Sequence, residues 1–146
     1  MDRAAVASEL QPLLVELVDL GLTAKQAHWN VTGPLFRPLH AQLDELADDA
    51  RMWADEVAER LVAIGVPSDG RIETVAAHTP LSAFPDGFVE DSKVVVAIVT
   101  RLDEIVGRIR SRVDRLAVAD PVTQDMVIVI ATGLDKHRWM FAAQQH

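Results

Sequence analysis

The stretch LFRPLHAQLDELADDARMWADEVAERLVAI, residues 35–64, decides the fold. Its apolar side chains recur every three or four residues, which is the spacing of a helix that buries one face. The repeating positions are Leu39, Leu43, Leu46, Ala50, Trp53, Val57, Leu61 and Ile64. Helix-breaking residues flank the stretch, Gly33-Pro34 before it and Gly65-Val66-Pro67 after it. The pattern therefore predicts one helix of about 45 Å from Leu35 to Ile64, with Pro38 in its first turn.

Three further helices are predicted on either side of this one. Before it, apolar residues keep helical spacing from Ser8 to Val31, and Ser8-Glu9-Leu10-Gln11 has the form of a capping box that would place Pro12 in the first turn. After it, the apolar pattern returns at Val94 and continues to Leu116. Asp120-Pro121 then supplies the N-cap and first-turn proline of a last helix that reaches the C-terminus.

A connection of about two dozen residues, Gly65 to Phe88, joins the second helix to the third. It contains Pro67, Gly70, Pro80, Pro85 and Gly87, so we expect a short helical turn there at most. The whole pattern indicates an all-α protein with a single domain over residues 1–146. The architecture it favours is a four-helix bundle with a long crossover between the second and third helices.

The charge and composition exclude several classes of function. The chain has 14 Lys and Arg against 22 Asp and Glu, and this net charge of −8 opposes non-specific binding to nucleic acid or anionic membranes. The sequence has no Cys, which excludes disulfides, thiolate metal sites and thiol catalysis. The longest apolar runs, Val94–Val99 and Met126–Ala131, are too short to span a membrane. We expect a soluble, cytoplasmic protein.

Four side chains that could bind a metal lie on one face of the helix over residues 35–64. They are His40, Asp44, Asp55 and Glu59, and a step of about 100° per residue places them in one stripe that points away from the apolar face. Asp44 and Asp55 are eleven residues apart, about 16 Å along the axis, whereas metal–oxygen bonds are about 2 Å long. One chain therefore cannot hold one metal ion with both carboxylates. A charged stripe is more often a solvated face, and that alternative stays open here.

The spacing of these residues suggests a site shared by two chains. If an identical helix packs antiparallel on the stripe, with a two-fold axis between Asp49 and Ala50, residue n faces residue 99 − n of the partner. The pairs that meet are His40 with Glu59, Asp44 with Asp55, and Asp48 with Arg51, the last as a reciprocal ion pair. Each dimer thus has two equivalent sites of one His and three carboxylates, ligands that suit iron or manganese. His28, across the short turn from His40, is either a further ligand or a core histidine.

Two separated motifs resemble those of a known family. Residues 25–40, KQAHWNVTGPLFRPLH, followed by Asp44 and by DEVAER at residues 55–60, are similar to the signature of the Dps family (DNA-binding protein from starved cells), the mini-ferritins. The resemblance implies a ferritin-like four-helix bundle that assembles as a hollow dodecamer built from two-fold dimers. It also implies a ferroxidase centre at each dimer interface. The ligands that the family pattern implies are His28, His40 and Asp44 from one chain with Asp55 and Glu59 from its mate.

The resemblance also implies an enzymatic activity. Family members are ferroxidases that bind two ferrous ions per centre and oxidise them, usually with hydrogen peroxide in preference to dioxygen. They store the ferric product as a mineral and so protect the cell against oxidative damage. Trp29, next to His28, matches a family position near the centre, where it either quenches stray radicals or is a packed aromatic residue.

Two departures from the family pattern bear on function. The sequence has three Lys and no Lys-rich tail, which makes DNA binding doubtful. The Glu-x-x-His motif that builds a di-iron site inside a single bundle is absent from the sequence, which favours the shared centre. Two alternatives stay open: a DNA-binding nucleoid protein with a vestigial metal site, and a bundle that binds only zinc or manganese.

Several other polar residues have weaker assignments. Asp120 and Asp125, at the start of the last helix, are candidates for an acidic iron channel, although Asp120 is already explained as a cap. A stripe of arginines along the third helix indicates a solvated or subunit-contact face rather than a nucleic-acid site. The stripe consists of Arg101, Arg108, Arg112 and Arg115. Three histidines have no partner at a ligand spacing and are assigned no chemistry, namely His78, His137 and His146.

Overall fold

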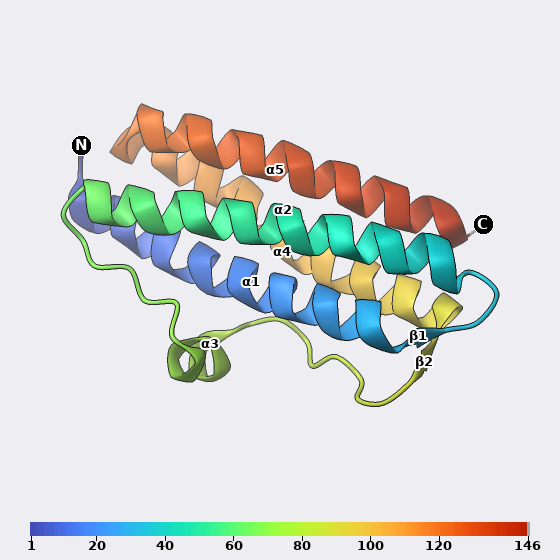
Figure 1. Cartoon of the computed structure of the whole chain (residues 1–146). Coiled ribbons are helices and arrows are strands. Elements are labelled where there is room, and N and C mark those ends of the chain that lie inside the picture. The colour runs from blue at the N-terminus through green and yellow to red at the C-terminus, as the bar shows by residue number, and fades with distance from the viewer. Residues whose placement is uncertain (146) are drawn as a thin grey trace.

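In residues 1–145, which the computed structural model describes, four long helices form the fold (Figure 1). They are α1 Arg3–Asn30, α2 Phe36–Ala63, α4 Asp91–Ala119 and α5 Pro121–Ala142. The shorter elements are α3 Ile72–His78, the 3-10 helix η1 Ala143–Gln145, and the strands β1 Val31–Thr32 and β2 Val89–Glu90. The predicted all-α four-helix bundle with a long connection between its second and third long helices is confirmed.

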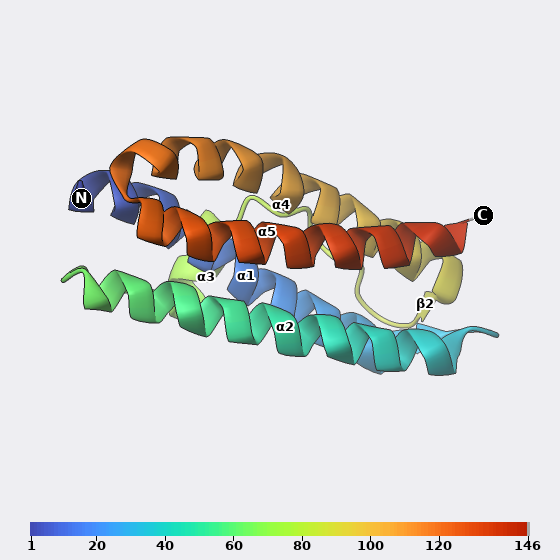
Figure 2. The ribbon, with the colours of Figure 1, turned by 90° about the horizontal axis from the view of Figure 1, so that it is seen from above.

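The helices pack as two pairs. α1 and α2 lie side by side as an antiparallel hairpin, and Figure 2 shows α4 and α5 as a second pair across the bundle. The apolar positions that predicted α2 are all buried in the core between the pairs. The connection from α2 to α4 runs back along α1, so that β2 pairs in parallel with β1 and α4 begins beside the α1–α2 turn (Figure 1).

The start of α1 differs from the prediction. Asp2 is the N-cap, its side chain accepting a hydrogen bond of 3.1 Å from the backbone N–H of Ala5, and the helix begins at Arg3 rather than at Ser8. The expected capping box is therefore wrong, and the Ser8 hydroxyl donates to the backbone oxygen of Ala5 instead. Pro12 lies inside the helix, where it is exposed. The carbonyl group it leaves without a helical partner, that of Ser8, is on an exposed residue that water can reach.

The connection is more structured than expected. It contains α3, a helix of 7 residues rather than a single turn. Arg101 of α4 holds the connection, donating a hydrogen bond of 2.8 Å to the backbone oxygen of Ser82 while its guanidinium lies 5.0 Å from the ring centre of Phe84.

The arginine stripe of α4, predicted as a solvated or subunit-contact face, is only partly solvated. Arg101 and Arg112 are buried, and Arg108 and Arg112 both form ion pairs with the fully buried Glu16 of α1. Arg115 also pairs with an α1 carboxylate, that of Glu9. A solvated face is therefore wrong for Arg101 and Arg112, because charge on one helix does not reveal the partners on its neighbours, while the subunit-contact alternative stays a prediction.

The start of α5 agrees with the prediction. Asp120 caps the helix and accepts hydrogen bonds from Thr123, and Pro121 is in the first turn. The carboxylate also accepts a bond of 2.7 Å from Arg60 at the end of α2. Asp120 is thus occupied as a cap and ion-pair partner, while Asp125 is exposed. Among residues 1–145, no helix has an apolar stretch that could cross a membrane.

Candidate metal centre

Two histidines from adjacent helix ends form the centre of the site. His28 lies in the last turn of α1 and His40 in the second turn of α2, and their rings stack with centroids 3.6 Å apart and planes 12° from parallel. The Nδ1 atom of His28 is 2.5 Å from the backbone oxygen of His40. In return, the Nδ1 atom of His40 is 2.8 Å from the backbone oxygen of His28. The two helix ends are therefore joined by a reciprocal pair of hydrogen bonds.

These reciprocal bonds fix which nitrogen of each ring carries the hydrogen. A backbone carbonyl only accepts, so both Nδ1 atoms donate. In the neutral ring the other nitrogen, Nε2, then keeps a free lone pair. Metal-binding histidines commonly donate their second ring nitrogen to a carbonyl in this way, which fixes the tautomer and the ring orientation. The arrangement prepares both histidines to bind a metal through Nε2.

Asp44 lies one turn after His40 and forms an ion pair with Lys25 of α1. The hydrogen bond from Lys25 lowers the pKa of the Asp44 carboxyl below its usual value, and the charge of the Lys25 ammonium acts in the same direction. The Asp44 carboxylate is thus ionised and already holds a cation, the Lys25 ammonium. A metal ion bound by Asp44 would have to displace that ammonium.

Asp55 and Glu59 lie further along α2 and are exposed. Within residues 1–145, no three His, Asp or Glu side chains come together in a geometry that could hold a metal ion. The chain brings His28 and His40 into contact with each other and near Asp44, but it does not bring Asp55 or Glu59 to them. The proposed completion of the site by a second chain stays a prediction.

Two other predicted features lie on exposed positions beside the site. Asp48 and Arg51 are exposed on α2 and form no ion pair with another residue of the described part of the chain, so their reciprocal pairing across a dimer stays a prediction. Trp29 is 65% exposed, so the core of its own chain does not pack this ring. The indole lines a shallow hollow with Lys25, Arg51 and Phe84.

Sequence reasoning missed a hydrogen bond between a buried histidine and a carboxylate. His137 of α5 is 4% exposed and donates a hydrogen bond of 2.6 Å from Nε2 to the Asp49 carboxylate of α2. Its ring also meets Trp53 edge to face, with 6.0 Å between centroids. The signal that could have found it is the helical spacing of His137 with Leu134 and Phe141, which predicts a buried position. His146 lies outside the described residues.

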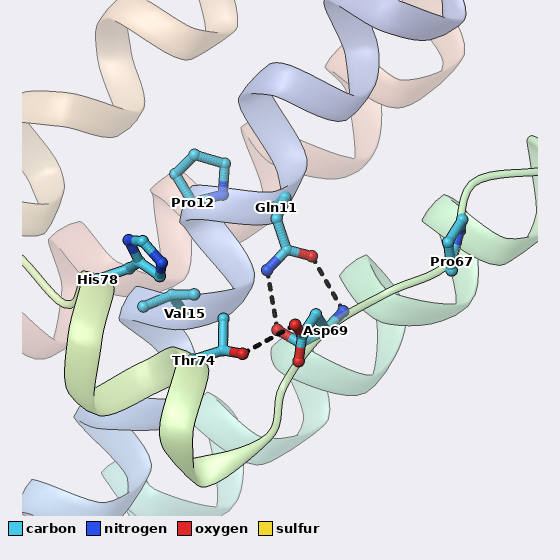
Figure 3. Close-up of a pocket in the computed structure, with 7 residues that line it drawn as sticks. All are labelled: Gln11, Pro12, Val15, Pro67, Asp69, Thr74 and His78. Carbon is cyan, nitrogen blue, oxygen red and sulfur yellow. Dashed lines mark hydrogen bonds between the residues drawn. The ribbon is translucent and has the colours of Figure 1, made fainter.

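His78 lines a hollow between α1 and α3 (Figure 3). The polar groups of this hollow already bond to one another. The Gln11 amide exchanges two hydrogen bonds with the backbone of Asp69, at 2.8 and 3.0 Å, and the Asp69 carboxylate accepts a bond from Thr74. The hydrogen bonds from Arg71 and Thr74 hold the pKa of Asp69 well below its usual range. The hollow therefore fastens the connection to α1 and does not offer a set of free ligands.

Comparison with known proteins supports the same family. A family model described as a ferritin-like domain matches residues 7–146. The "DNA protection during starvation protein 2" of Deinococcus radiodurans is 36% identical over 134 residues, which cover 92% of this chain and 56% of that protein. This chain thus spans little more than half of that relative. The "DNA protection during starvation protein" of Agrobacterium fabrum is 32% identical over 142 residues, covering 97% of this chain and 88% of that protein.

Solved structures agree with the sequence comparison. Dps from Microbacterium arborescens, in a form described as high iron, has a TM-score of 0.93 and 38% identity and covers 97% of this chain and 93% of that chain. Dps92 from Deinococcus radiodurans has a TM-score of 0.95 and 34% identity, with 97% of this chain and 86% of that chain covered.

Proposed function

The chain belongs to the Dps family of ferritin-like proteins, and from that premise we propose that it is a ferroxidase. It oxidises ferrous iron at a centre shared by two chains and stores the ferric product. The observation that carries the proposal is the reciprocal bonding of His28 and His40, which leaves both Nε2 atoms free beside the Asp44 carboxylate. This half-site lies in one chain. The carboxylates that would complete it, Asp55 and Glu59, are exposed on the same helix and free to meet a second copy.

In the proposed dimer, two copies of α2 lie antiparallel around an axis between residues 49 and 50. The partner's Glu59 then comes to His40, and the partner's Asp55 comes to Asp44. One ferrous ion binds to His40, Asp44 and the partner's Glu59, and a second binds near His28 and the partner's Asp55. Imidazole and carboxylate ligands suit iron, and the carboxylates, being anionic and hard, favour its ferric state.

Iron is the substrate of the proposed reaction. Each of two ferrous ions gives up one electron, and hydrogen peroxide accepts the pair together with two protons, so that its O–O bond breaks and two water molecules form. Dioxygen is the alternative oxidant. The protein's own contribution is to hold the two ions together with carboxylates that stabilise the higher charge. We expect the ferric ions to be stored inside a closed assembly of twelve copies in the cytoplasm.

We do not propose DNA binding as the main function. The chain carries a net charge of −8, which opposes attraction to phosphates. Three arginines of α4 that could otherwise contact a nucleic acid form ion pairs with Glu9 or Glu16 of α1. The negative net charge therefore favours binding of a cation by the protein over binding of DNA.

Single substitutions test the centre. Asp44→Ala and Glu59→Ala should each abolish fast peroxide-dependent oxidation of ferrous iron while leaving the assembly intact, because each removes a ligand from an exposed face. Glu56→Ala, which removes an exposed carboxylate of α2 outside the stripe, should keep the wild-type rate. The rate is followed by stopped-flow absorbance of the ferric product, and particle mass is measured in parallel. Wild-type rates in both ligand variants would overturn the proposal.

Mixing the two inactive variants tests whether the centre is shared. In a dimer of one Asp44→Ala chain and one Glu59→Ala chain, one site has lost both ligands, whereas the other has kept both. With random co-assembly half of the dimers are mixed, so we expect about one quarter of the wild-type activity to return. If each chain carried its own complete site, co-expression of the two variants would restore no activity.

A further inference from the structure

The N-terminal end of α2 is capped by a carboxylate from another helix. Leu35, at the N-cap position, has no side chain that can accept a hydrogen bond. Its backbone N–H donates instead to Oδ2 of Asp91, the first residue of α4, over 2.8 Å. The other oxygen, Oδ1, accepts a bond of 2.8 Å from the backbone N–H of Ser92. One carboxylate thus satisfies free N–H groups at the starts of two helices, where negative charge is favourable.

The turn before α2 packs directly on this carboxylate. Gly33 has a φ of +115°, and a Cβ atom at this position would lie 2.7 Å from Oδ2 of Asp91, which is too close for any side chain. The parallel pairing of Val31 with Val89 and of Thr32 with Glu90 brings the start of α4 to this place. The turn and the Asp91 carboxylate therefore fit together only with glycine at residue 33.

This turn connects the two histidines of the candidate centre. His28 lies three residues before Val31, and His40 lies five residues after Leu35, so the reciprocal hydrogen bonds of the histidines close across the segment that Asp91 fastens. Each of those bonds joins a ring on one helix to the backbone of the other. Separation of the start of α2 from the end of α1 would lengthen both bonds.

We propose that Asp91 is a positioning residue that fixes the tautomer and orientation of His28 and His40 by fastening the α1–α2 turn. The inference rests on the proposed function for its effect on iron, because the histidines act there as ligands. Asp91 itself contacts neither the histidine rings nor the metal. Its loss should weaken the binding of ferrous iron and leave the ligand set unchanged.

Three variants test this role against a matched control. Asp91→Asn keeps an acceptor oxygen and loses the charge, and Asp91→Ala loses both. Gly33→Ala displaces the carboxylate and also strains the turn, because alanine disfavours the φ of +115°. Glu90→Gln removes the neighbouring carboxylate, which is 69% exposed and pairs only with Lys93 at 3.7 Å within the described residues. All four proteins are compared with the wild type after their particle masses are shown to agree.

The first readout is the tautomer of the histidines in metal-free protein, measured by solid-state NMR with 15N-labelled histidine. In the wild type and in Glu90→Gln, the signals of His28 and His40 should show hydrogen on Nδ1. In Asp91→Ala and Gly33→Ala, both residues should show a mixture of Nδ1 and Nε2 tautomers, and Asp91→Asn should be intermediate. A residue that acted only as a helix cap would change the unfolding temperature without moving these signals.

The second readout is anaerobic titration with ferrous iron, in which no oxidation occurs. Loss of groups that orient metal ligands weakens metal binding by 10- to 100-fold, so Asp91→Ala should bind ferrous iron about tenfold more weakly than the wild type. Wild-type tautomers together with wild-type affinity in Asp91→Ala would overturn the inference. A wild-type protein that bound no ferrous iron would overturn the proposed function instead, and the NMR signals of the metal-free variants would still decide the role of Asp91.

Discussion

Lys25 and a ferrous ion would compete for the same carboxylate. The ammonium of Lys25 pairs with Asp44, and both side chains are partly exposed, at 22% and 41%. The same ion pair keeps the pKa of Asp44 low, so the carboxylate stays charged and attractive to any cation. In the proposed centre, Lys25 thus keeps the Asp44 carboxylate ionised and occupies it until a ferrous ion binds.

Lys25→Gln should therefore strengthen binding. We expect ferrous iron to bind about two- to fivefold more tightly at neutral pH, since exposed ion pairs contribute little and the ion no longer has to break one. Anaerobic titration with ferrous iron measures the change. Lys93→Gln, which removes the lysine of another exposed ion pair, is the control and should leave the affinity unchanged. Weaker binding in Lys25→Gln would mean that Lys25 assists the metal.

The shared face of the candidate ligands on α2 could be predicted from the sequence, and their role as ligands stays a prediction, whereas the ion pair of Lys25 could not be predicted. Helical geometry fixes which residues of one helix share a face, so His40, Asp44, Asp55 and Glu59 follow from their spacing. The contact between Lys25 and Asp44 joins two helices. It depends on how α1 packs against α2, and spacing within either helix does not contain that information.

At the level of helices, Asp120 joins the end of α2 to the start of α5. Its carboxylate accepts hydrogen bonds from Thr123 and from Arg60, and these lower the pKa of Asp120 from 3.8 to about 2. The folded protein therefore binds the proton less well than the unfolded chain does. The resulting stability is fully present above the unfolded pKa and is lost as the pH falls through the folded pKa.

Asp120→Asn tests this contribution. Asparagine can still cap a helix, so the variant removes mainly the charge, and we expect a loss of about 1 to 2 kcal/mol in the free energy of unfolding above about pH 5. The difference from the wild type should shrink as the pH falls from about 4 toward 2, because the wild-type carboxyl then becomes neutral too. Urea unfolding at a series of pH values measures it. Asp125→Asn, an exposed change in the same helix, should have no effect, and a pH-independent difference at Asp120 would contradict the ion-pair explanation.

Helix existence was predictable from periodicity, and the start of α5 from its cap, but the start of α1 and the buried arginines of α4 were not. Asp2 starts α1 because its side chain caps Ala5 and its backbone N–H bonds to the oxygen of Ala119, a contact from the far end of α4. The local signal at Ser8 was outweighed by these contacts. Arg112 was expected on a solvated face and is buried because Glu16 of α1 lies opposite.

For the whole molecule, the proposed dimer makes a prediction that does not involve iron. In the antiparallel register, Asp48 of each chain faces the partner's Arg51, so every dimer has two such ion pairs. Asp48→Arg and Arg51→Asp should each weaken the dimer, since each places like charges together. The double variant should restore it. Mass photometry across a dilution series measures the assembly, and a double variant that assembled no better than the singles would exclude this register.

The four-helix fold of the whole molecule was predictable from the sequence. Of the crossover between α2 and α4, only its existence and approximate length were predictable. The breakers between residues 65 and 88 indicated a long connection, and the structure adds α3 and the pairing of β1 with β2. Two-residue strands carry no periodicity that a sequence pattern could reveal. Their position depends on the connection returning along α1, which is a property of the complete chain.

The return of the crossover to the α1–α2 turn has a consequence for protein synthesis. A ribosome delivers His28 and His40 before Asp91, the carboxylate proposed to fasten the turn between them. A nascent hairpin of α1 and α2 therefore leaves the ribosomal exit tunnel before its turn can bond to Asp91. If Asp91 fastens the histidine pair as proposed, the pair becomes rigid only after the start of α4 has left the ribosome.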